Sequence, residues 1–289
     1  SKLKENLTND RELAFQCKDL ATIRKDAPVA LTLTETTWPG AKKEDLLKFF
    51  EEMDFKSFIA QLQTSSADDV SAGPTLSKLE VEALDEAKVE KLVYDKASDI
   101  SFYLELSDDN YHTADFWGFG LKIDDRYYAT RDVELLKLPK LKQLLEDPAI
   151  QVDVFDGKQT YVALKRIGIE LKNINFDLLL VSYLLNTSDN SNDLGNLAKR
   201  HDYFDVLTDE EVYGKGSKRK VPVDDAIYFE HLAHKLKAIS ELEDKLMKEL
   251  AENEQEDLYF EIERPLSLVL AQMEITGIKV DRERLDIMQ

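Results

Sequence analysis

The sequence has little of several features that would point to particular classes of protein. It contains one cysteine, Cys17, which excludes an internal disulfide framework and a zinc site built from cysteines. No apolar run approaches the roughly 18 residues of a membrane span, and the first ten residues have no signal-peptide core. We therefore expect a soluble protein of the reducing cytoplasm that does not contact a membrane.

Basic residues are scarce relative to acidic ones. The 289 residues hold 38 Lys and Arg against 58 Asp and Glu, a formal net charge of −20 at pH 7. Residues 1–62 are nearly neutral, with 10 basic and 11 acidic side chains, so residues 63–289 hold 28 basic and 47 acidic ones. Nonspecific DNA affinity comes mainly from phosphates neutralised by Lys and Arg. Autonomous DNA binding by this chain is therefore disfavoured.

The composition nevertheless predicts a folded chain, because 43% of the residues are hydrophobic and 33% are charged. Residues 1–62 show helical spacing of apolar residues on both sides of an irregular segment, which predicts two helices. Residues 63–77 are rich in Ser, Asp, Gly and Pro and lack apolar periodicity, which predicts a linker. Beyond the linker, residues 78–253 have the mixed pattern of an α/β domain.

The elements of this α/β domain follow from the period of its apolar residues. Asp124 and Asp125 lie between two β-rich runs and predict a two-residue hairpin turn. An apolar helical stripe in residues 254–289 ends at Gly277. The predicted strands are 100–106, 116–123, 126–130 and 150–155, and the predicted helices are 133–146, 157–167, 176–186, 192–201 and 223–253.

Three segments resemble parts of bacterial DNA polymerase I, a family A polymerase, and occur in the same order. Residues 2–29 resemble the end of its 5′-nuclease domain, 168–186 a part of its proofreading domain, and 263–281 the start of its polymerase domain. The resemblance implies a fragment with three parts. These are the C-terminal part of a 5′-nuclease domain (1–62), a 3′-5′ exonuclease-like domain (78–253) and the start of the polymerase or thumb domain (254–289).

The resemblance also implies a particular fold and a set of sequence motifs that a catalytically active member would contain. The fold is α/β and RNase H-like, a mixed sheet flanked by helices, with mainly helical extensions at both ends. Active members of the family hold two divalent metals, which stabilise the attacking and leaving oxygens of phosphodiester hydrolysis when several carboxylates bind them. The first motif needs an Asp and a Glu two residues apart on one strand. Here Leu104 and Leu106 stand at those positions and continue the apolar stripe of Ile100 and Phe102.

The other two motifs are also incomplete. The second has an Asn followed by an Asp four residues later, and the matching positions are Asp156 and Thr160. The third has a Tyr four residues before an Asp, and here these are Val221 and Asp225, so only Asp225 is retained. We therefore predict no catalytic residue, no metal ligand and no cofactor in this chain. Mg²⁺ is expected only for the polymerase domain of the parent enzyme.

Two other functions stay open at this point. An active metal-dependent 3′-5′ exonuclease could use a different carboxylate set, such as Glu105, Asp108 and Asp225, although Glu105 points away from the face of Leu104. An acidic module that recruits a protein partner is the other alternative. The remaining expectations are a monomer, contact with the other polymerase and nuclease domains, and DNA binding only in the full-length enzyme.

Two further clusters have ordinary structural interpretations. His231 and His234 share a helix face, but a metal site would need a partner from a second element, so we interpret them as core or surface residues. The basic run 214–220 is interpreted as a solvated loop, with contact to a DNA phosphate in the full enzyme as the less favoured reading.

Overall fold

The computed structural model describes most of the chain beyond residue 75 and a smaller part before it. The chain divides into two compact units, Ser1–Glu52 and Met53–Gln289, which are treated separately below. The predicted second helix of residues 1–62 and residues 63–75 of the predicted linker lie outside the continuously described part. The described residues are 2–24, 28, 42, 46, 49, 50, 53, 55, 58, 76–187, 191–216, 219–281, 284, 287 and 288.

The first of the two helices predicted in residues 1–62 is present but interrupted. Two helices, α1 (Lys2–Asn9) and α2 (Arg11–Ala21), are separated at Asp10, which lies in a non-helical backbone conformation. α2 buries none of its residues, and Phe15 and Leu20 are 58% and 81% exposed. This helix therefore presents apolar surface that its own unit does not cover.

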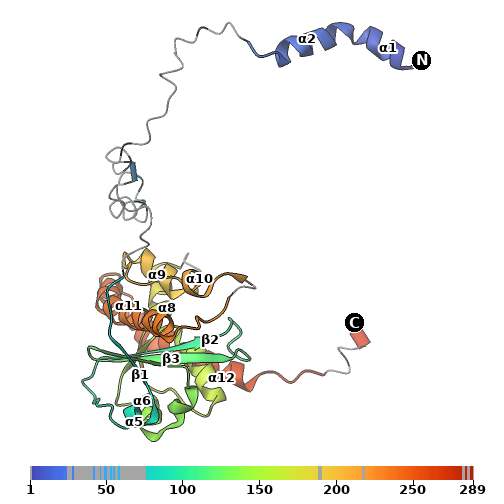
Figure 1. Cartoon of the computed structure of the whole chain (residues 1–289). Helices are drawn as coiled ribbons and strands as arrows, with labels where there is room; N and C mark the ends of the chain where they lie inside the picture. Colours follow the sequence, from blue (N-terminus) through green and yellow to red (C-terminus); the bar gives the residue numbers. More distant parts are fainter. Residues whose placement is uncertain are drawn as a thin grey trace. The chain divides into compact units, whose positions relative to one another are not determined.

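The second unit is built on a mixed six-stranded sheet with the order β1-β4-β3-β2-β5-β6 (Figure 1). The central strands β2, β3 and β4 form an antiparallel meander, whereas β1 pairs with β4, and β5 with β2 and β6, in parallel. The strand bounds are β1 (Val81–Ala83), β2 (Ile100–Leu106), β3 (Phe116–Ile123), β4 (Arg126–Thr130), β5 (Val152–Val154) and β6 (Ile174–Asp177).

Helices cover both faces of this sheet. Figure 1 shows α8, α9, α10 and α11 on one face and α5 and α6 on the other. Among the described residues, no helix is long and apolar enough to cross a membrane. The helical bounds are α5 (Glu86–Val89), the 3₁₀ helix η1 (Val133–Lys137), α6 (Pro139–Glu146), α7 (Gly157–Arg166), α8 (Leu178–Leu185), α9 (Leu194–Arg200), α10 (Asp209–Tyr213), α11 (Asp225–Glu252), the π-helix η3 (Leu258–Glu263) and α12 (Arg264–Thr276).

Most of the predicted elements are present, with corrections that have local causes. β2, β3 and β4 have the predicted bounds, and Asp124 adopts a left-handed φ of 52° in the predicted hairpin turn. The predicted helix 133–146 is divided, because Pro139 begins α6 and the preceding turn is 3₁₀. The predicted helix 176–186 starts too early, since residues 174–177 form β6. Such a short apolar run cannot be assigned to strand or helix by periodicity alone.

The sheet and α11 approach each other closely at Gly120 of β3. A β-carbon built on Gly120 would lie 2.9 Å from the Cδ1 atom of Leu236 and 3.3 Å from the Cβ atom of Leu232. Both leucines are fully buried. The glycine is therefore required for packing, since it lets the long helix lie against the middle of the sheet.

A buried carboxyl group also lies between the sheet and α11. Asp153 of β5 is 4% exposed, and the Asn175 side-chain amide donates to its Oδ1 atom at 3.0 Å and to Oε1 of Glu243 at 2.8 Å. Burial, and then the charge of Glu243, raise the pKa of Asp153 to about 8. At neutral pH the folded protein therefore holds a proton on this carboxyl group.

We predict that this proton makes stability fall as the pH rises. An unfolded Asp has a pKa of about 3.9, so between pH 4 and pH 8 the folded state binds more protons than the unfolded state. The free energy of unfolding should decrease by on the order of a few kcal/mol over this range. Asp153→Asn should flatten the dependence in urea denaturation at pH 5, 6.5 and 8. Asp115→Asn, at an exposed position, is the control and should leave the slope unchanged.

Candidate functional site

The first candidate position is the C-terminal half of β2, where the two faces of the strand have different surroundings. Leu104 and Leu106 are 4% and 5% exposed and belong to the apolar core that includes residues of α6, α7 and α12. Glu105 points to the opposite face and meets α11, as the alternation along a strand requires. Apolar side chains therefore occupy the positions where the family pattern has its first two metal ligands.

The other candidate positions also make structural contacts. Thr160 of α7 is 3% exposed, and its hydroxyl donates to the carbonyl oxygen of Asp156 at 2.9 Å. Val221 is half-buried against the core on the α11 side of the sheet. Asp225, the one retained acid, begins α11 and accepts a 2.7 Å hydrogen bond from Nε of Arg131. Its carboxylate is thus paired with a cation from the end of β4.

The alternative set of Glu105, Asp108 and Asp225 does not form a shared site among the described residues. Glu105 is bonded to Lys235, and Asp225 to Arg131. Asp108 lies in an exposed turn, where its Oδ1 atom accepts the backbone N–H of Asn110 at 2.8 Å. Within the part of the chain that the structure describes, no three His, Cys, Asp or Glu side chains form a group able to hold a metal ion. The residues present therefore do not fit a two-metal centre.

A small cavity remains at this end of β2. Its volume is about 110 Å³, and its lining includes Leu104 and Leu106 together with five acidic residues, Glu105, Asp108, Asp109, Asp156 and Asp209. Sites for small organic ligands usually occupy about 300 to 1,000 Å³. The cavity is thus too small to enclose a nucleotide.

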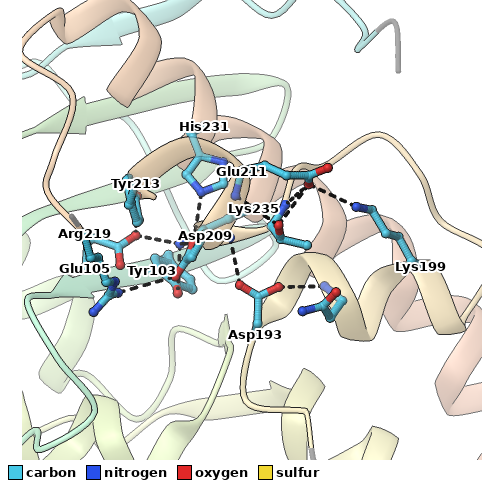
Figure 2. A network of polar contacts seen from close by, with 12 residues as sticks. Tyr103, Glu105, Asp193, Lys199, Asp209, Glu211, Tyr213, Arg219, His231 and Lys235 are labelled. Carbon is cyan, nitrogen blue, oxygen red and sulfur yellow. Dashed lines mark hydrogen bonds and ion pairs between the residues drawn. The ribbon is translucent and has the colours of Figure 1, made fainter. Parts of the chain in front are cut away.

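On the other face of β2, a buried lysine lies within a network of polar contacts (Figure 2). Lys235 of α11 is 1% exposed, and its Nζ atom lies 2.6 Å from Oε2 of Glu105 and 2.6 Å from Oδ1 of Asp209. It also donates to the hydroxyl of Tyr103 at 3.2 Å, while Tyr213 donates to Glu105 at 2.7 Å. One ammonium group thus joins β2, α10 and α11 and pairs with one buried acid, Glu105, and one half-buried acid, Asp209.

Neighbouring residues extend this network over the loop that carries α10. His231 is 4% exposed and bonds through Nε2 to Oδ1 of Asp209 at 3.0 Å. Arg219 donates to the carbonyl oxygen of Ser107 at 2.6 Å, and its guanidinium lies 5.1 Å from the centre of the Trp117 ring. Asp193 accepts the backbone N–H of Asp209 at 2.8 Å and thereby connects α9 to α10 (Figure 2). The network therefore holds α10 and Arg219 against the sheet.

The electrostatics of the network agree with its geometry. Burial opposes the charge on Lys235, but Asp209 and Glu105 outweigh it and raise the lysine pKa well above its usual value. Burial likewise opposes the charge on Asp209, yet Lys235 and His231 lower the Asp209 pKa. Burial raises the pKa of Glu105 to about 7 despite Lys235. At neutral pH, Lys235 and Asp209 are therefore the firmly charged partners.

Sequence reasoning did not find this network. The basic run 214–220 was predicted to be a solvated loop, but Arg219 is packed against Trp117; residues 217 and 218 lie outside the described residues. His231 and His234 are buried, and His231 bonds to an acid from another helix. One usable signal was Glu105, the single charged residue of a buried strand, because a buried acid needs a counter-charge. The sequence does not say which lysine supplies it.

A family model described as DNA polymerase I, ribonuclease H-like domain, matches residues 102–242. DNA polymerase I of Geobacillus stearothermophilus is 41% identical over 289 residues, which cover 99% of this chain and 32% of that protein. The Bacillus subtilis DNA polymerase I is 35% identical and covers 98% of the chain. The chain belongs to the bacterial DNA polymerase I family. It spans about a third of the length of these polymerase I relatives.

Solved structures of low sequence identity support the RNase H-like fold of this polymerase I domain. The apo form of a nuclease aligns with a TM-score of 0.53 and 16% identity, covering 68% of this chain and 92% of that one. The POL domain of Mycobacterium smegmatis Pol1, in complex with DNA primer-template and dNTP, aligns with a TM-score of 0.53 and 20% identity, covering 72% and 34%. The predicted fold class is thus confirmed.

The buried network should be essential for the stability of this polymerase I domain. Lys235→Met removes the ammonium but keeps much of the side-chain volume, so Glu105 and Asp209 lose their counter-charge in a dry site. We expect a loss of about 3 to 5 kcal/mol in the free energy of unfolding, measured by urea denaturation.

Lys137→Met is the matched control, because Lys137 pairs with Glu134 at the surface. That change should cost less than about 1 kcal/mol. Equal losses in the two variants would contradict a stabilising role for the buried ammonium.

Proposed function

We propose that this chain is part of a DNA-directed DNA polymerase that acts in DNA replication and repair, and that its exonuclease-like domain is a structural platform without nuclease activity. The main support is the burial of Leu104 and Leu106 in the apolar core. Hydrolysis by two metal ions needs carboxylates that grip both ions. Leucine at these positions supplies no ligand.

The other parts of the chain take roles that follow from the family. We propose that residues 1–62 end a 5′-nuclease domain, 63–77 connect it to the exonuclease-like domain at 78–253, and 254–289 begin the polymerase domain. DNA is then bound by the longer enzyme, with Mg²⁺ used in its polymerase domain. The isolated chain binds DNA weakly or not at all, since its net charge is −20.

A platform must fix the direction of the segment that leaves it, and one carboxylate is placed to do this. Glu274 of α12 accepts a hydrogen bond from the Tyr111 hydroxyl at 2.8 Å and from Nζ of Lys158 at 2.7 Å. Nε2 of His112 lies 3.1 Å from the same carboxylate. These donors come from α7 and from the loop after β2. Residues of α7 and of the loop after β2 thus anchor α12, the helix that follows the domain.

The proposal is tested by metal binding and 3′-end degradation, measured together. Mg²⁺ and Mn²⁺ are titrated into the chain by calorimetry, and single-stranded DNA labelled at its 5′ end is incubated with each metal. We expect no binding heat from a tight site and no shortening of the DNA. Loss of nucleotides from the 3′ end, abolished when Asp225 or Glu105 is replaced, would establish the alternative exonuclease.

Restoring the acids of the family pattern should damage the fold. Each buried leucine contributes about 1.5 to 3 kcal/mol through burial of its side chain. The triple variant Leu104→Asp, Leu106→Glu, Thr160→Asp should therefore melt well below the parent in differential scanning calorimetry without divalent metal. A melting temperature equal to that of the parent would mean that these positions are not part of a packed core.

The anchoring of α12 can be tested separately. Glu274→Gln removes the charge that attracts Lys158 and should weaken the last two turns of α12 by about 1 kcal/mol, since the contacts are partly exposed. Hydrogen exchange at residues 268–276 should become several-fold faster, while α11 keeps its protection. Glu261→Gln, at an exposed position in η3, is the control. Unchanged exchange in the Glu274 variant would argue against the anchor.

A further inference from the structure

A second, larger hollow lies between α8 and α12, away from the leucines of β2. Its volume is about 470 Å³, roughly four times that of the cavity beside Leu104. Leu179 and Tyr183 of α8 form one wall, and Leu266 and Leu270 of α12 form the other. This groove has the size of a site that receives a ligand or several side chains of a partner.

The walls of the groove expose more apolar surface than a closed core would. Tyr183 is 48% exposed, and Leu266 and Leu270 are each 42% exposed. Leu266 and Leu270 are four residues apart on α12 and so lie on one side of the helix. Contiguous apolar surface on a folded protein commonly marks a place where another molecule binds. A groove between two helices suits a helix with apolar side chains at helical spacing.

The charge around the groove restricts what can bind there. Residues 249–263, which precede α12, hold seven acidic side chains and no Lys or Arg. Glu263 from this run lines the groove. DNA and a second copy of this chain, with its net charge of −20, are both repelled by such a surface. The favoured occupant carries positive charge beside its apolar anchors.

Two of the acids that line the groove, Asp156 and Asp177, are already hydrogen-bonded, and its lining cation, Lys158, is paired with Glu274. This leaves Glu263 and the acidic run to meet a cation. Asp177 accepts backbone N–H groups from Asp156 at 3.1 Å and from Gly157 at 2.7 Å. Asp156 in turn accepts the N–H of Gln159 at 2.9 Å. These carboxylates cap helices and so have a structural role. Asp156 and Asp177 therefore shape the groove, and Glu263 and the acidic run 249–263 supply its negative charge.

We propose that this groove binds an amphipathic helix of a separate protein, with apolar anchors between α8 and α12 and Lys or Arg residues over the acidic run 249–263. The apolar anchors supply the burial that holds the helix in place. The opposite charges supply orientation and a faster association, which salt should weaken. The inference does not depend on whether the exonuclease-like domain is catalytically inactive.

The test uses three labelled synthetic helices of about 18 residues and the complete 289-residue chain. One has leucines at helical spacing and lysines elsewhere, the second has glutamates in place of the lysines, and the third is a scrambled form of the first. In fluorescence anisotropy, the first should bind about tenfold more tightly than either of the others. Its affinity should also decrease as NaCl is raised. Equal binding of all three peptides would overturn the proposal.

Matched variants locate the binding surface. Leu270→Ala should weaken the basic amphipathic peptide several-fold, whereas Val269→Ala, which shortens a 49% exposed side chain that does not line the groove, should not. Glu263→Lys should weaken binding more than Glu80→Lys, at an exposed position outside the groove. Equal effects within either pair would overturn the assignment to this groove, provided that circular dichroism shows all variants folded.

Two further measurements exclude other occupants. Sedimentation should show a monomer, and dimerisation abolished by Leu270→Ala would assign the groove to a second copy. The basic peptide should also bind the full-length polymerase from which the chain derives. Binding to the 289-residue chain alone would mean that the remaining polymerase sequence covers the groove, and the claim of a separate partner would then be wrong.

Discussion

The ammonium group of Lys235 is the contact on which the arrangement of this domain most depends. It is buried between β2 and α11 and pairs with Glu105 from the sheet and Asp209 from α10. An unpaired charge in such a place would cost several kcal/mol, so the three elements are held in one relative position. Contacts of Arg219, His231 and Tyr213 then attach α10 and Arg219 to the same part of the sheet. The positions of α10 and α11 on this face of the sheet therefore depend on this one interaction.

The two faces of β2 have different surroundings within the RNase H-like fold. Side chains alternate along a strand, so Leu104 and Leu106 enter one core while Glu105 enters the network on the other side. A register shift that restored an acid to the first face would move the leucines into the network. Burial on both faces therefore opposes such a shift. The strand is retained for packing, which is consistent with a platform.

The α12 helix connects these observations to the longer enzyme. Its buried side includes Ala271, which belongs to the core of Leu104 and Leu106. Glu274 ties its end to Lys158 and to the loop after β2. The opposite side leaves Leu266 and Leu270 in an open groove next to an acidic run. One helix thus carries both the Glu274 contacts and one wall of the groove.

The sequence by itself determined the meander of β2, β3 and β4, the long helix α11, the end of α12 at Gly277 and the apolar character of positions 104 and 106. These follow from periods of two and 3.6 residues and from turn residues, which act over a few neighbours. The short strands β1 and β6 escaped prediction, since three or four residues form a strand only when a neighbouring strand supplies hydrogen bonds. Tertiary structure alone decided that Lys235 meets Glu105 and that α8 and α12 enclose a groove. Both bring together residues more than 80 positions apart, and no local pattern specifies such a pairing.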